Sequence, residues 1–191
     1  MTDNNRRTLM TRSAENFTTR EDGGELYLEG YFAVFNSNYE IADGMTESID
    51  PHAFDNTAGD DIRCLINHDS TFVLGRTAAG TLELRIDSHG LWGKVTVNRN
   101  DRAAMDLYAR VQRGDVDGCS IGFEILSEET DFDSRETHWT ITDIRLYEVS
   151  VVTFPAYEET NVAARQKDAA EARKRSLDAF KTRLKERLAH A

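Results

Sequence analysis

The sequence predicts a mostly β domain, in which antiparallel strands form a barrel or a sandwich and one or two helices lie outside it. Three observations predict this class. Short segments of alternating apolar residues recur along the chain, glycine-containing turns such as TAAGT and DSHGL separate several of them, and the 191 residues include only two prolines. We expect one domain with appendages, because about 150 residues bury enough surface to fold without disulfides.

The strands are predicted from alternation along the chain. The first covers residues 25–36 (ELYLEGYFAVFN), which are rich in aromatic side chains, and Gly30 marks an expected β-bulge there. Residues 1–24 are polar and lack a sustained period, so we expect a flexible N-terminal arm. Six further segments are predicted to be strands: 61–68, 81–87, 91–97, 118–126, 138–144 and 146–154.

One internal helix is predicted within residues 100–115 (NDRAAMDLYARVQRGD). Asn100 or Asp101 is suited to cap its start and Gly114 to end it. A shorter helix is expected over residues 50–57, with Asp50 as its cap and a proline at its first position. The apolar side chains of the longer helix fall on one face: Ala104, Leu107, Tyr108 and Val111.

Charge is distributed unevenly along the chain. Residues 167–191 carry 8 Lys or Arg against 4 Asp or Glu, a balance of +4, whereas the other 166 residues carry 15 basic and 30 acidic side chains, a balance of −15. An acidic body repels nucleic acid and anionic membranes, so we expect neither as a main partner.

The C-terminal segment after Pro155 is predicted to be helical, with a basic face and a partial apolar stripe. Such a helix packs on a partner or on a second copy of the chain, the alternative being a frayed and solvated tail. We therefore expect a basic helical tail over residues 161–191. The stripe consists of Ala172, Leu177, Phe180, Leu184 and Leu188.

The two cysteines, Cys64 and Cys119, lie far apart and match no zinc or haem spacing, so we expect free thiols in a reducing cytosol. The sequence contains no apolar run of the roughly 18 residues that a membrane span needs, and its N-terminus lacks a hydrophobic signal core. These features predict a soluble, intracellular protein.

The first candidate for chemistry is the strand VDGCSIGFEIL. Side chains alternate across a strand, so the apolar face should turn to the core, while Ser120, Gly122 and Glu124 face outward. Gly122 would then leave room for a substrate backbone beside Ser120. This alternation of side chains favours Ser120 over Cys119 as a nucleophile, although it does not show that either residue reacts. The predicted core face consists of Cys119, Ile121, Phe123 and Ile125.

A serine nucleophile needs a general base, which is most often histidine. Among the five histidines we favour His68, which ends the apolar strand 61–68 and points with Cys64 if that strand stays regular. Strand ends suit a site because they are rigid on one side and open on the other. The structural alternative is an ordinary histidine at a turn.

Glu148 is the third candidate, because it interrupts an apolar strand and shares a face with Ser150. A carboxylate there is costly unless it is paired, and it could orient a histidine as the acid of a Ser-His-acid triad does. The alternative is an ordinary ion pair with Arg145 or another base. Asp69 is a rival acid, although it is poorly placed to reach the ring of its neighbour.

Five blocks of sequence resemble the prohead (procapsid maturation) serine proteases of tailed bacteriophages. They occur in the family's order within residues 25–160, and read TESIDPHAF, LINHDSTFVLGRT, GTLELRIDSHGLW, GDVDGCSIGF and LYEVSVVTFPAY. That family is similar in fold to the herpesvirus capsid-maturation proteases. The resemblance therefore implies a protease domain over residues 25–160, built as a barrel of about seven mainly antiparallel strands with peripheral helices.

Carried over by position, the resemblance makes Ser120 the nucleophile and His68 the general base. Glu148 lies in a family block and becomes the third member, with Asp69 or His52 as alternatives. His52 stands where the family usually has glycine in a Pro-Gly-Ala-Phe turn. No cofactor or metal is implied, and the oxyanion-binding amides are not identified.

The function that the resemblance implies is that of a serine endopeptidase. Its expected substrates are the scaffolding segment of the major capsid protein and the protease itself, cut inside the assembling procapsid in the host cytoplasm. The enzyme is also expected to associate with itself there. The basic tail is then a docking or self-processed segment.

Two other classes of function remain open from the sequence. One is a non-catalytic assembly or scaffolding module with a protease-like fold. The other is a metal hydrolase that uses His52, His68 and Asp69, although these residues lack the close spacing of a common ligand set.

Overall fold

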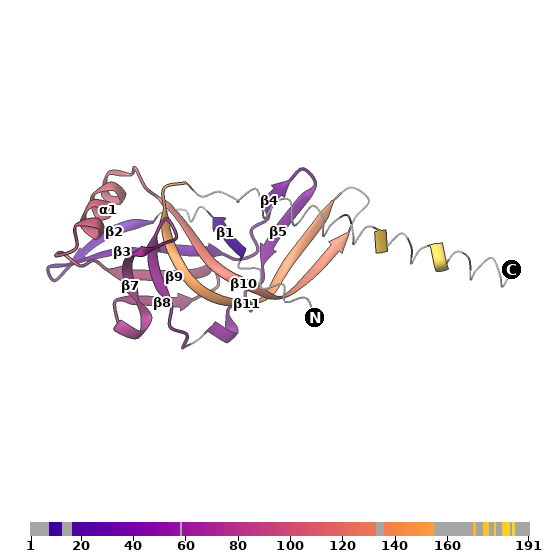
Figure 1. Cartoon of the computed structure of the whole chain (residues 1–191), viewed down its shortest axis with the longest axis horizontal. Coiled ribbons are helices and arrows are strands. Elements are labelled where there is room, and N and C mark those ends of the chain that lie inside the picture. The colour runs from indigo at the N-terminus through magenta and orange to yellow at the C-terminus, as the bar shows by residue number, and fades with distance from the viewer. Residues whose placement is uncertain are drawn as a thin grey trace.

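The computed structural model describes residues 8–12, 17–57, 59–132 and 136–154, and in the C-terminal segment positions 170, 174, 175, 178, 181–183 and 185. Within these residues the strands pair into one sheet of seven strands and one of four (Figure 1). The mostly β class is therefore confirmed. Among the described strands no closed barrel is found, because they divide between these two sheets.

The larger sheet is built on two long neighbouring strands, β10 (Gly118–Phe132) and β11 (Thr137–Val152), which Figure 1 shows running along the length of the molecule. β11 pairs in parallel with β5 through its first part and with β6 through its last part. The other strands are β1 (Thr8–Arg12), β4 (Tyr39–Ala42), β5 (Met45–Ile49), β6 (Arg63–Ile66) and β7 (Asp69–Arg76).

The smaller sheet is antiparallel, with the strand order β2-β3-β9-β8. Its members are β2 (Thr18–Asp22), β3 (Glu25–Val34), β8 (Leu82–Ile86) and β9 (Gly90–Thr96). The helix α1 (Arg102–Arg113) lies at one end of the molecule beside this sheet (Figure 1). Two short 3₁₀ turns, η1 (Asp55–Thr57) and η2 (Thr77–Ala79), complete the described elements.

The predicted internal helix is confirmed, because local signals determine both of its ends. The Asp101 side chain accepts hydrogen bonds from the backbone amides of residues 103 and 104, and Gly114 ends the helix in the left-handed conformation. Its buried side chains are the four predicted ones, Ala104, Leu107, Tyr108 and Val111.

Other predicted elements differ from the structure. Residues 8–12 and 18–22 form strands within the predicted flexible arm, because they pair with β10 and β3. The predicted strands 138–144 and 146–154 are parts of the one strand β11, which ends at Val152. The expected short helix at residues 50–57 is a turn followed by the three-residue η1.

The predicted bulge at Gly30 is also wrong. The register of β3 shifts between Tyr31 and Ala33. Gly30 has a different role, since an added Cβ would come within 2.5 Å of the Phe17 ring. The glycine therefore permits close packing of an aromatic side chain.

The predicted C-terminal helix lies largely outside the described residues. The few described positions of that segment are helical and exposed. The domain boundaries and the tail as a unit remain predictions. In the described part of the chain, no helix has the length and apolar character needed to cross a membrane.

Candidate active site

The candidate site begins with one face of the β10–β11 pair. Ser120 lies directly opposite Ser150, and Gly122 lies directly opposite Glu148. Side chains that face each other across two strands share one face of the sheet. The neighbouring residues on the other face, including Cys119 and Ile121, belong to the main hydrophobic core. The predicted division of β10 into an apolar core face and a second face is therefore confirmed.

Ser120 is not exposed as predicted, because its exposed fraction is 0%. β10 is an interior strand, flanked by β1 on one side and β11 on the other, with Thr11 of β1 opposite Ser120. Ser150, beside Ser120 on the same face, is also fully buried. The second face of β10 is thus buried at Ser120, which alternation along one strand cannot reveal.

A β-bulge directs Glu148 to this face. The register between the strands shifts so that Gly122 pairs with Glu148 but Phe123 pairs with Leu146, which leaves Tyr147 as the extra residue. Leu146 and Val149 consequently both face the core, whereas Glu148 lies between them on the opposite face. Without the bulge, Glu148 would share the core face with Leu146.

His68 reaches the site from the turn between β6 and β7. The two-residue loop consists of Asn67 and His68, with φ angles of 51° and 61°. Positive φ at both central positions is typical of a type I′ hairpin turn, and a histidine in this region costs roughly 1 kcal/mol. The strand does not stay regular as far as His68, because β6 ends at Ile66 and the turn removes His68 from its alternation, so His68 does not point with Cys64. Cys64 is in the core.

The turn is attached to the end of β11 and the residue after it by three hydrogen bonds, two of which have side-chain acceptors. The Asn67 amide donates to the Val151 carbonyl at 2.9 Å, and the Asn67 side-chain oxygen accepts from the Thr153 amide at 2.9 Å. The His68 amide donates to Ser150 Oγ at 3.2 Å. These contacts offset the strain of the turn and fix the histidine relative to β11.

The His68 ring contacts the Glu148 carboxylate. Nδ1 lies 2.7 Å from Oε1, and the two side chains are 20% and 14% exposed. The other carboxylate oxygen, Oε2, accepts a hydrogen bond from Ser150 Oγ at 2.6 Å. A carboxylate at Nδ1 favours the tautomer that carries its proton there and leaves Nε2 as a proton acceptor. Nε2 is buried and has no hydrogen-bond partner among the described residues.

The alternative acids and histidines contact other groups. Asp69 is exposed and accepts hydrogen bonds from Thr71, whose hydroxyl and amide lower the pKa of its carboxyl below the ordinary value. The His52 side chain is 82% exposed and pairs with Asp55 at 3.0 Å. The alternative ion pair of Glu148 with Arg145 is not formed, because Arg145 contacts Glu124 at 3.2 Å.

Both cysteines are unsuited to nucleophilic chemistry. Cys64 and Cys119 are free thiols with an exposed fraction of 0%. Burial raises the pKa of the Cys64 thiol well above its ordinary value, and the negative charge of Glu148 adds to this shift. Burial likewise raises the pKa of Cys119. A thiol that stays protonated is a poor nucleophile.

Ser150 and Asn67 take part in the site, although neither was predicted to have a role in it. Ser150 stands two residues after Glu148 in an otherwise apolar strand, a spacing that places both on one face. Asn67 precedes His68, and asparagine is favoured where a hairpin turn requires positive φ. Both signals are present in the sequence.

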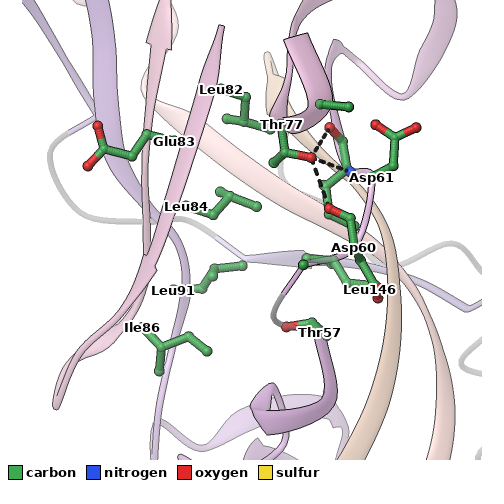
Figure 2. A pocket seen from close by; sticks show the side chains of 13 residues that line it. Thr57, Asp60, Asp61, Thr77, Leu82, Glu83, Leu84, Ile86, Leu91 and Leu146 are labelled. Atoms are coloured by element: carbon green, nitrogen blue, oxygen red, sulfur yellow. Dashed lines mark hydrogen bonds between the residues drawn. The ribbon is translucent and has the colours of Figure 1, made fainter. Parts of the chain in front are cut away.

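The described residues offer no alternative metal centre, since they contain no group of three or more His, Cys, Asp or Glu side chains placed to hold an ion. A cavity of about 590 Å³ lies apart from the candidate residues, between β8 and the loop before β6 (Figure 2). Its apolar wall includes Leu84, Ile86 and Leu91, and neither Ser120 nor His68 lines it. The cavity is therefore separate from the His68–Glu148 pair.

Residues 10–175 match the sequence model of a protein family, the caudovirus prohead serine proteases. The chain belongs to this family. It is also 32% identical over 148 residues to the prohead protease of Enterobacteria phage HK97, an alignment that includes 75% of this chain and 61% of that protein. The chain thus spans less than two thirds of the length of this relative.

A solved structure of the bacteriophage T4 capsid assembly protease also resembles the chain. The TM-score is 0.49 at 13% identity, over 75% of this chain and 95% of that one. The predicted membership of the prohead protease family is confirmed by the family match over residues 10–175.

Proposed function

We propose that this prohead protease family member is a serine endopeptidase with Ser120 as nucleophile, His68 as general base and Glu148 as the acid that orients the base. The observation that carries the proposal is the contact of 2.7 Å between His68 Nδ1 and Glu148 Oε1, together with the buried and unpartnered Nε2. Ser120 lies opposite Ser150 of β11, and Ser150 accepts a hydrogen bond from the His68 amide.

The proposed reaction is acyl transfer. Ser120 Oγ attacks the peptide carbonyl while His68 Nε2 takes its proton, and the imidazolium then protonates the leaving amine. Water attacks the acyl-enzyme in a second, equivalent step that releases Ser120. Glu148 holds the ring and stabilises the imidazolium that forms between these proton transfers.

The proposed substrates are the scaffolding segment of the major capsid protein and the protease chain itself. Family membership and the HK97 relative, a prohead protease, support an enzyme that acts inside the assembling procapsid in the host cytoplasm. The basic segment 161–191 is proposed to dock the enzyme into the shell or to be removed by self-cleavage. Its charge contrasts with that of the acidic body.

The complete burial of Ser120 favours a second candidate, a non-catalytic assembly module, because a substrate carbonyl reaches a buried serine only if the covering residues move. Co-expression with the major capsid protein separates the two functions. We expect a shortened capsid band with the unchanged chain and no shortened band with Ser120→Ala or His68→Ala, since removing either residue from such a site costs about 10⁴–10⁶ in turnover.

His52→Ala is the matched control for His68→Ala, because its side chain is exposed and paired with Asp55. It should process the capsid protein normally. Processing that persists in Ser120→Ala would exclude the proposed nucleophile. A chain that never shortens the capsid protein, while still entering procapsids, would support the assembly module.

A further inference from the structure

Gly122 occupies the position on β10 that lies directly against the Glu148 side chain. The two residues are partners across the β10–β11 pair. A Cβ added at Gly122 would overlap Glu148 Oε1 and would lie 3.0 Å from both Cγ and Cδ. Atoms at such distances repel strongly, so the carboxylate and a side chain at position 122 exclude each other.

The atoms that would have to move belong to the end of a side chain. The nearest atoms to the added Cβ are all in the Glu148 side chain, and none is in the backbone. Gly90 in β9 is different, because a Cβ there would overlap the backbone carbonyl oxygen of Ala33. A methyl group at position 122 would therefore displace the carboxylate, whereas a methyl group at position 90 would strain the sheet.

The displaced oxygen is the one that contacts the histidine. Oε1 lies 2.7 Å from His68 Nδ1, while Oε2 is held by Ser150 at 2.6 Å. A shift of Oε1 by the width of a methyl group breaks the contact with Nδ1. The ring then loses the group that sets its tautomer and orientation.

We propose that Gly122 is a positioning residue: its missing side chain provides the space in which the Glu148 carboxylate reaches His68. The inference rests on the proposed serine endopeptidase function. It replaces the expectation that Gly122 leaves room for a substrate backbone, because the carboxylate already occupies that room. It also explains why a glycine, which weakens a strand interior, stands in the middle of β10.

A double-mutant cycle tests this role. The four proteins are the unchanged chain, Gly122→Ala, Glu148→Ala and the double variant, each as the full chain. The rate of Ser120 labelling by a fluorophosphonate and the rate of cleavage of the major capsid protein are measured for each. Gly90→Ala is the matched glycine control, and thermal unfolding is recorded for all five proteins.

Gly122→Ala should slow both reactions by about 10²-fold, as expected when a catalytic group is misplaced by about 1 Å. In the Glu148→Ala background, the same substitution should change the remaining rate by less than about twofold, since no carboxylate is left to displace. Gly122→Ala should unfold close to the temperature of the unchanged chain, whereas Gly90→Ala should unfold at a clearly lower temperature.

The histidine ring gives an independent signature. The ¹⁵N resonances of the His68 ring report which nitrogen carries the proton. They should indicate the Nδ1–H form in the unchanged chain and a mixture of tautomers in both Gly122→Ala and Glu148→Ala. A purely structural role for Gly122 would not make these two variants alike.

Two results on activity, and one on folding, would overturn the inference. One is full activity of Gly122→Ala, and the other is an equal loss in both backgrounds, which would indicate a direct contact with substrate. If Gly122→Ala unfolds, the double variant decides, because its methyl group enters the space that Glu148 has left; an unfolded double variant contradicts the inference. Persistent cleavage by Ser120→Ala would instead refute the proposed function, so the two failures are distinguishable.

Discussion

The two faces of the β10–β11 pair both contain fully buried residues but differ in chemistry. On one face, Cys119 and Ile121 of β10 and Val149 of β11 have exposed fractions of 0%, and on the other face Ser120 and Ser150 also have 0%. The first face packs into the core, where each buried aliphatic side chain contributes about 1.5–3 kcal/mol. The second face is connected by hydrogen bonds, each with a net contribution of about 1 kcal/mol between neutral groups and about 1.5–3 kcal/mol to a charged group.

The comparison shows that burial alone does not separate the core from the site. The polar face contributes less hydrophobic stabilisation, and it holds a carboxylate between a histidine and a serine hydroxyl. A bulge at Tyr147 and a glycine at position 122 make this arrangement fit between two well-packed strands. Substitutions on the polar face should therefore change activity more than stability, and substitutions on the apolar face should do the reverse.

The largest effect in this comparison is expected for Glu148→Gln. The amide keeps the shape of the side chain but favours the wrong tautomer of His68, and the equivalent change in a serine protease triad costs about 10⁴ in turnover. The rate of capsid protein cleavage measures the loss. Glu124→Gln is the control, because Glu124 lies on the same strand face but pairs with Arg145. Its cleavage rate should stay within a few-fold of that of the unchanged chain.

Little loss in Glu148→Gln would point to another acid or to a serine–histidine dyad. Asp69→Asn would then be the next variant to measure. Because Asp69 contacts Thr71 in the structure, we expect Asp69→Asn to retain activity.

A smaller effect is expected for Ser150→Ala. The change removes the donor to Glu148 Oε2 and the acceptor of the His68 amide, and one hydrogen bond to a charged group contributes about 1.5–3 kcal/mol. Cleavage should slow by roughly 10- to 100-fold, the rate equivalent of that energy. Ser70→Ala, at an exposed position of β7, is the control. Unchanged cleavage by Ser150→Ala would show that the hydroxyl does not hold the carboxylate.

The smallest effect on activity is expected on the apolar face. Burial raises the pKa of the Cys64 and Cys119 thiols, so both remain protonated and unreactive at pH 8 in the folded protein. Iodoacetamide should not modify the two thiols in the folded protein and should not slow cleavage. Intact mass should show that they are alkylated only after urea unfolds the chain. Rapid inactivation by alkylation in the absence of urea would instead indicate a cysteine nucleophile.

The features that local patterns determine were predictable from the sequence. The helix α1 has its cap, its apolar face and its terminal glycine within a few residues, and the two faces of β10 follow from strict alternation. His68 and Glu148 were predicted as partners from motif resemblance and not from their geometry. They lie 80 residues apart in the chain.

The predictions that failed concern features that depend on pairing between distant segments of the chain. Ser120 is fully buried in an interior strand that lies between β1 and β11, and Glu148 faces the site because of a bulge at Tyr147. The orientation of His68 follows from positive φ at two residues of a turn. β7 was missed because most of its side chains are exposed, so it lacks the alternation that identifies a half-buried strand.

The most direct test of the proposed serine nucleophile is to map the residue that a fluorophosphonate labels in protein that is actively cleaving the major capsid protein. Peptide mass spectrometry should find the adduct on Ser120, and His68→Ala should abolish it. An adduct on another serine would contradict the assignment of Ser120. Undiminished cleavage by protein that is fully labelled on Ser120 would contradict it as well.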